Sequence, residues 1–174
     1  MPPYAPSLGA FTDPSPGMRP NALRLTLLLS DLNEPSYQVS LQLRLEGPNV
    51  TLQTPPNAYP AIYTLTPGMP LMLENADLAP YFDPGLLQAS GTSRSDLIRS
   101  GGALPEGNYT LNISALDIRR QVIVSNTAFF PMYLEDLDPP LIVLPEAATS
   151  LPETGFLPLA WMPQHLGAFL VRYT

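Results

Sequence analysis

The sequence predicts an all-β fold, an immunoglobulin-like antiparallel β-sandwich of about seven to nine strands with a short helical crossover insert. Several segments alternate apolar and polar residues with the period of two that is typical of a strand with one buried face. The 23 prolines recur between these segments, and turn signals follow one another every ~8–12 residues, as in known sandwiches. A chain of 174 residues suits one domain with additions.

The clearest strand pattern spans residues 37–46. The apolar residues on one side are Val39, Leu41, Leu43 and Leu45, and the polar ones on the other are Gln38, Ser40, Gln42, Arg44 and Glu46. A strand places each set on its own face, whereas a helix cannot. The same one-sided pattern predicts a strand over 23–29. It predicts another within 104–117, where the strand follows a turn at Pro105 to Gly107.

Shorter apolar runs supply the remaining strands. One spans 50–55. The runs 61–65 and 69–73 flank Pro67–Gly68, a strong turn signal, and predict either a β-hairpin or a bent edge strand, of which Pro70 favours the second. The run from Val122 to Leu134 contains Asn126 and Pro131, which predict a bulge or a break into two pieces. A last strand is expected at 141–144.

The strand pattern lapses between residues 74 and 102. One helical turn is expected within 76–82, and Ser93, with Asp96 three residues later, predicts the cap of a short helix that ends near Gly101. Two interpretations stay open for this insert: a variable functional surface, or a connection that covers one open end of the sandwich. The second is favoured.

The sequence divides into three parts. Residues 1–20 form a Pro-rich extended arm, residues 21–146 form the sandwich, and residues 147–174 form a linker and the start of a second, truncated β-sandwich module.

Charge and composition narrow the function classes. The chain has 8 Lys and Arg against 15 Asp and Glu, a formal charge of −7, and it lacks a basic stripe. Nucleic acids and anionic membrane surfaces are therefore not expected as partners. No run of ~18 apolar residues predicts direct membrane insertion. The absence of cysteine excludes disulfides and thiolate metal sites, and no cofactor is expected.

Few residues suggest chemistry. His165 is the single histidine and lies in the tail, which argues against a His-based triad. Glu135, Asp136 and Asp138 could offer oxygen ligands to calcium, with help from carbonyls or from carboxylates such as Asp117. The competing interpretation, a solvated acidic turn at a domain hinge, is favoured.

Aromatic residues provide the candidate ligand-binding site. Tyr63, Tyr81 and Phe82, together with Tyr59, could form a patch on which a sugar stacks. Half-buried packing is the more common role of such residues.

Five segments together carry a family resemblance. They read LRLTLLLSDLNEPSYQVSLQLRLEG at 23–47, YTLTPGMPLMLENADLAPYFDP at 63–84, LPEGNYTLNISALD at 104–117, VIVSNTAFF at 122–130 and LDPPLIVLP at 137–145. Their order and wording resemble the TANFOR domain of large exported Bacteroidetes proteins. The W-x-P-x-H phrase at 161–165 is similar to the opening of a fibronectin type III-like module that follows in such proteins.

The resemblance implies a secreted or cell-surface, non-catalytic module in a multidomain protein, exported by a type IX kind of machinery. The expected function is therefore structural or adhesive. Its expected partners are neighbouring β-sandwich domains of the same polypeptide, other surface proteins, or glycans. The alternative hypotheses are a carbohydrate-binding module that uses the 74–102 insert and, third, an enzyme built on a carboxylate pair.

Overall fold

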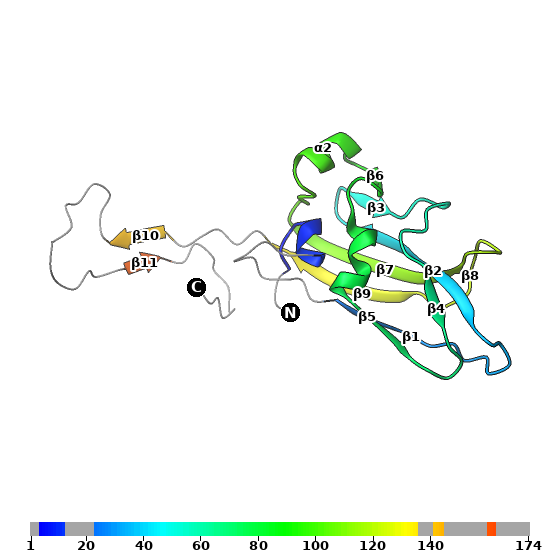
Figure 1. Ribbon diagram of the computed structural model, residues 1–174. Helices are drawn as coiled ribbons and strands as arrows, with labels where there is room; N and C mark the ends of the chain where they lie inside the picture. Colours follow the sequence, from blue (N-terminus) through cyan, green and yellow to red (C-terminus); the bar gives the residue numbers. More distant parts are fainter. Residues whose placement is uncertain (1–3, 13–22, 136–140, 145–159, 163–174) are drawn as a thin grey trace. The chain divides into compact units, whose positions relative to one another are not determined.

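The computed structural model describes residues 4–12, 23–135, 141–144 and 160–162. It contains two units, Met1–Glu135 and Asp136–Thr174. The first unit has nine strands in antiparallel sheets, which confirms the predicted all-β sandwich with a short helical crossover (Figure 1). Its elements are η1 (Leu8–Phe11), β1 (Arg24–Leu27), β2 (Tyr37–Glu46), β3 (Thr51–Gln53), β4 (Tyr63–Leu65), β5 (Leu71–Glu74), α1 (Asn75–Leu78), η2 (Ala79–Phe82), β6 (Gln88–Ser90), α2 (Arg94–Arg99), β7 (Gly107–Asp117), β8 (Val122–Ile123) and β9 (Ala128–Leu134).

The two long strands β2 and β7 form the centre of a seven-stranded sheet. They pair without interruption from Val39 opposite Asp117 to Glu46 opposite Thr110. The other edge of β2 pairs with β4 and β3, and β6 lies beside β3. The other edge of β7 pairs with β9 and β8. Paired residues share a face, so the apolar sets that the sequence predicted on β2 and β7 combine into one buried inner face.

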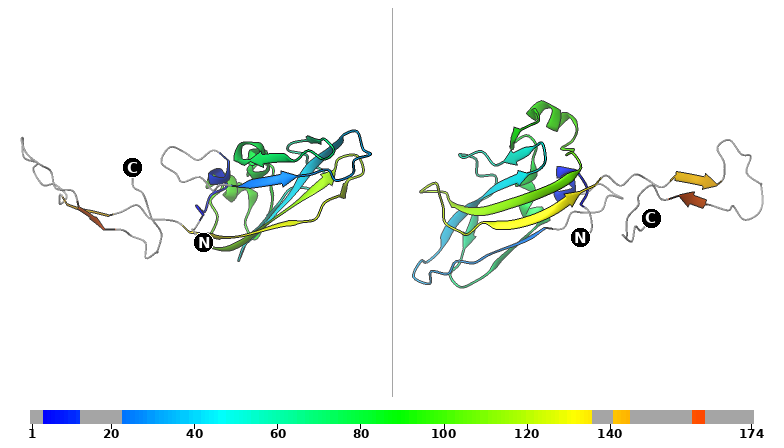
Figure 2. Two further views of the ribbon diagram at one scale, coloured as in Figure 1. Left: turned by 90° about the horizontal axis from the view of Figure 1, so that it is seen from below. Right: turned by 180° about the vertical axis from the view of Figure 1, so that it is seen from behind.

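A two-stranded sheet of β1 and β5 covers part of that inner face. Leu25 lies opposite Leu73, and Leu27 lies opposite Leu71, and all four pack against the core. In Figure 2 (left), β1 lies on the same side of the large sheet as the helices. The strands are thus divided seven and two between the sheets, whereas a constant-type immunoglobulin domain divides them four and three.

Of the two structures predicted for 61–65 and 69–73, the hairpin is wrong. The turn at Pro67–Gly68 does form, with Gly68 at a φ of 68°, but β4 pairs with β2 and β5 pairs with β1. The Gly68 amide donates to the Leu29 carbonyl oxygen, which draws the chain towards β1. The two runs are therefore edge strands of different sheets, and the turn is the corner between them.

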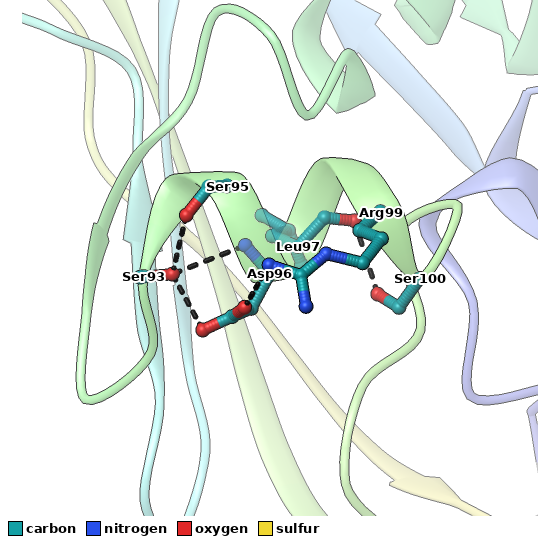
Figure 3. A network of polar contacts seen from close by, with 6 residues as sticks. All are labelled: Ser93, Ser95, Asp96, Leu97, Arg99 and Ser100. Carbon is teal, nitrogen blue, oxygen red and sulfur yellow. Dashed lines mark hydrogen bonds and ion pairs between the residues drawn. The ribbon is translucent and has the colours of Figure 1, made fainter.

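The insert contains the predicted helical segments. α1 and η2 occupy 75–82, and α2 begins at the expected cap, where the Ser93 hydroxyl accepts from the Asp96 amide at 3.0 Å (Figure 3). An ion pair of 2.9 Å between Arg99 and Asp96 spans the helix. The sequence did not predict β6, whose residues Gln-Ala-Ser carry no alternation signal but pair with β3. The insert thus adds a strand to the large sheet as well as covering its inner face.

The long run 122–134 breaks into β8 and β9, as expected, and Asn126 lies in the break. Pro131 causes no second break, because the register of β9 against β7 continues through it, with Pro131 opposite Thr110. Proline is tolerated there because β9 is an edge strand, so the N–H group that Pro131 lacks is not needed for the hydrogen bonds with β7.

Residues 4–12 depart from the predicted extended arm. Leu8 and Phe11 are fully buried in the core, and Phe11 stacks on Phe82 with ring centroids 5.0 Å apart. Tyr4 exchanges backbone hydrogen bonds with Tyr133 and Glu135 at the end of β9. The segment is part of the domain because its apolar side chains fill the end of the sandwich between η2 and β9. The other residues of the predicted arm lie outside the described ones.

The predicted domain boundary at residue 146 is also corrected. The strand predicted at 141–144 forms β10 (Leu141–Leu144), but it pairs with β11 (Ala160–Met162) in the second unit. The first unit ends at Glu135, eleven residues before the predicted boundary. The position of the boundary depends on which strands pair, and the apolar pattern of the sequence does not show that pairing.

Candidate functional site

The outer face of the seven-stranded sheet carries a row of side chains aligned by strand pairing. Gln88, Gln53, Arg44, Asn112 and Phe129 lie on β6, β3, β2, β7 and β9, and each is the register partner of the next. At an interstrand spacing of about 4.8 Å, the row spans ~19 Å. Neighbouring rows add Gln42 opposite Ser114 and Glu46 opposite Thr110. The face therefore offers a broad band of amide, hydroxyl and charged groups.

A shallow groove of about 560 Å³ follows this band. Amides and hydroxyls line its floor, and apolar groups flank it at one side: Ile123 of β8 and Phe129 of β9. The Phe129 ring is 72% exposed and Ile123 is 59% exposed. Together, Phe129 and Ile123 give the groove an exposed apolar edge beside its polar floor.

Two side-chain atoms in the groove floor are buried without a hydrogen-bond partner in the described part of the chain, Gln42 Nε2 and Asn112 Oδ1. Buried polar atoms are nearly always paired. Gln42 and Asn112 are diagonal neighbours on β2 and β7, and both unpartnered atoms are buried rather than presented to solvent. The amide nitrogen of Asn112 donates to Glu46 at 3.0 Å.

The charges of the groove cancel each other. Arg44 and Glu46 form an ion pair of 2.8 Å, and both line the groove. The pair is solvent-exposed, so it contributes little to stability. Its effect is electrostatic: the floor has no net charge with which to attract an anion or a cation.

A second hollow of about 480 Å³ lies between β1 and the inner face of the large sheet. Its lining mixes aliphatic side chains, such as Leu27, Leu41 and Ile113, with polar ones, such as Tyr37 and Arg120. It is the part of the inter-sheet space that the two-stranded sheet leaves uncovered.

Asp117 is the one buried carboxylate among the described residues, with 4% exposure. Its Oδ2 accepts from the Tyr37 hydroxyl at 2.5 Å, and its Oδ1 accepts from the amides of Arg119 and Arg120. The Tyr37 hydrogen bond, followed by the Arg120 amide, holds the pKa of Asp117 below its usual value. Asp117 is therefore an ionised residue that organises the turn after β7.

The structure does not expose the predicted aromatic patch. Tyr81 and Phe82 are 1% and 2% exposed, so neither ring can stack on a ligand. The Tyr81 hydroxyl accepts from the Leu41 amide and donates to the Ala61 carbonyl oxygen, which completes the edge of β2 where no strand pairs. Tyr63 is half-buried, donates to the Asp77 carbonyl oxygen, and burial raises its pKa. The packing interpretation of these residues is the one that their burial supports.

The proposed calcium ligands are only partly described. Glu135 is half-buried, and its amide donates to the Tyr4 carbonyl oxygen, while Asp136, Asp138 and His165 lie outside the described residues. Among those that are described, no group of three acidic or histidine side chains is gathered for a metal. Asp117, one of the supporting ligands considered, is engaged with Tyr37.

Sequence reasoning assigned Gln42, Arg44 and Asn112 to polar faces but did not align them. Their alignment depends on the register between β2 and β7, which joins residues 66 positions apart in the case of Asn112 and Glu46. Phe129 was also missed, because an apolar run does not reveal which of its members points outward. The available signal was its position in an edge strand, one residue from the inward Phe130.

Comparison with known proteins found no matching family model, no matching curated protein and no matching solved structure. Within the described residues, no helix is both long and apolar enough to cross a membrane.

Proposed function

We propose that this chain is a non-catalytic, adhesive β-sandwich module that holds its ligand on the outer face of the seven-stranded sheet. The observation that carries the proposal is the groove itself: a floor of amide, hydroxyl and paired charged groups beside the exposed ring of Phe129. Such a surface is formed before a ligand arrives, because most of the side chains in it come from strands of the sheet.

A binding role fits the ionisable groups better than catalysis does. A carboxyl group that acts as a general acid or base needs a free oxygen beside the substrate. Asp117 is the buried carboxylate of the described part, and both of its oxygens already accept hydrogen bonds, one from Tyr37 and the other from backbone amides. Glu46 in the groove is paired with Arg44. These contacts support a module that binds without reacting.

The setting of the module is proposed from the resemblance to the TANFOR domain. The resemblance supports a setting in a large exported protein at the cell surface, with neighbouring β-sandwich domains as intramolecular partners. The polar, proline-rich composition, with only 13% charged residues, supports an extracellular location, because typical soluble domains carry about 25%.

Adhesion of beads coated with the full chain tests this proposal. Coated beads are passed over films of gelatin, dextran and xylan, and retention under flow is counted. We expect retention on at least one film, and we expect Phe129→Asp to reduce it at least tenfold, because the charge disrupts the apolar rim.

The matched control is Met72→Asp, which alters a residue of β5 that is 59% exposed on the other sheet. Beads with this variant should bind as the wild type does. Equal retention of the Phe129→Asp and wild-type beads, or no retention on any film, would overturn the proposal.

A further inference from the structure

We infer that the outer groove binds a neutral polysaccharide chain, laid across the strands from β3 to β9. This inference rests on the proposed function and names the ligand class of the same site. It also moves the carbohydrate-binding hypothesis from the insert aromatics, which are buried, to a face that the sequence had marked only as solvated.

Hydrogen-bonding chemistry is the first argument. Gln42, Gln53 and Asn112 line the groove with amides, and Ser114 and Thr127 line it with hydroxyls. Amides and hydroxyls both donate and accept, as sugar hydroxyls do. Gln42 Nε2 and Asn112 Oδ1 are buried beneath this surface, so a sugar chain meets the exposed amide and hydroxyl groups around them.

The balanced charges of the groove and the negative charge of the whole chain favour a neutral ligand. Arg44 and Glu46 neutralise each other at 2.8 Å, and Glu46 also accepts from Asn112. The whole chain carries a formal charge of −7, which repels anionic polymers at long range. An anionic polysaccharide would therefore meet no free cation in the groove, whereas a neutral one loses no charge interaction on binding.

The aromatic rim gives the ligand its orientation. Phe129 is the register partner of Asn112, and its ring is 72% exposed. The apolar face of a sugar ring can pack on this surface while its hydroxyls reach the floor. The row from Gln53 to Phe129 crosses four strands, ~14 Å at the usual spacing, so the groove accommodates an extended chain rather than a single sugar.

Affinity electrophoresis of the full chain tests the inference. Native gels contain dextran, amylose, xylan or galactomannan as neutral probes and alginate as the anionic probe. We expect retardation in at least one neutral gel and none in alginate. Phe129→Ala and Asn112→Ala should each weaken that retardation at least tenfold, with unchanged circular-dichroism spectra.

Tyr133→Ala provides the matched control, because Tyr133 is an exposed aromatic residue of the same strand, at 40% exposure, that does not line the groove. It should leave retardation unchanged. The inference fails if no neutral gel retards the chain, if alginate retards it more strongly, or if Phe129→Ala and Tyr133→Ala behave alike.

The two proposals fail separately. If beads adhere to gelatin through the outer face while no neutral polysaccharide retards the chain, the adhesive function stands and its ligand is a protein. If Phe129→Asp leaves adhesion to every film unchanged, the outer face is not the binding surface and both proposals fall.

Discussion

The Tyr37 hydroxyl donates to Asp117 Oδ2 at 2.5 Å and joins residues 80 positions apart in the chain. Tyr37 begins β2 and Asp117 ends β7, so the bond fastens the end of the central strand pair. Asp117 also holds the turn at 118–121 through the Arg119 and Arg120 amides. One carboxylate thus connects the central strands to the turn that leads into β8.

This bond makes stability depend on pH at the acidic end. Because the folded-state pKa of Asp117 is lowered, its contribution is complete above the unfolded pKa of about 3.9. That contribution is lost as pH falls through the lower folded-state pKa. Urea midpoints measured from pH 7 to pH 2 should fall at the acidic end, and Tyr37→Phe should fall less, because it has already lost the hydrogen bond. Tyr133→Phe is the control and should follow the wild type. Identical pH profiles for Tyr37→Phe and wild type would contradict the assignment.

Tyr81→Phe should destabilise the domain by about 1–3 kcal/mol, because it leaves the buried Leu41 amide without its acceptor. Tyr63→Phe removes a hydrogen bond to Asp77 on the surface and should cost less than about 1 kcal/mol. Urea unfolding at pH 7 measures both. If the two variants lose equal stability, the Tyr81 hydroxyl does not complete the edge of β2.

Phe11→Ala should destabilise the first unit by about 3–5 kcal/mol, the usual cost of a large cavity. Its ring is fully buried and stacks on Phe82. Phe129→Ala makes the same chemical change at an exposed position and should stay within ~0.5 kcal/mol of the wild type. Thermal unfolding distinguishes the two. A Phe11→Ala variant as stable as the wild type would mean that residues 4–12 form an arm after all.

Comparing Gly91→Ala with Gly101→Ala separates the stability cost of an unfavourable backbone conformation from that of a steric clash. Both glycines have positive φ, 84° and 66°, which costs a residue with a side chain about 1–2 kcal/mol. A Cβ at Gly91 would lie 1.9 Å from the Asn49 carbonyl oxygen, whereas one at Gly101 would meet nothing within 4 Å. Urea unfolding should show Gly91→Ala to be less stable than Gly101→Ala by a further ~1–3 kcal/mol. Equal losses of stability would mean that Gly91 lies further from the Asn49 carbonyl oxygen than it does in the structure.

Local patterns were sufficient for the elements but not for their partners. The alternation at Val39 to Leu45 predicts β2, and the Ser93 cap predicts α2, because each signal is contained within a few residues. The pairing of β5 with β1 is decided by the leucines at 25, 27, 71 and 73, which lie far apart in sequence. Nothing near Pro67–Gly68 distinguishes a hairpin from a corner between sheets.

The candidate site shows the same division. The sequence identified the outward residues of β2 and β7, including Gln42 and Asn112, since period-two alternation assigns faces. It could not identify the groove, because the groove exists only when β6, β3, β2, β7 and β9 lie side by side in register. The aromatic candidates failed for a related reason: Tyr81 and Phe82 follow each other in a 3-10 helix whose burial depends on η1.

The distance along the chain between paired strands has a kinetic consequence. The ion pair of Arg24 with Glu74 joins residues 50 positions apart, and the paired residues of β2 and β7 lie further apart still along the chain. Domains dominated by such non-local pairs fold in milliseconds to seconds, because loop closure precedes any gain from contact. During synthesis, β2 leaves the ribosome long before β7 has been made and can pair with it. Its row of leucines then stays unpaired while the insert is made, and this interval is when the chain is most exposed to aggregation or to a chaperone.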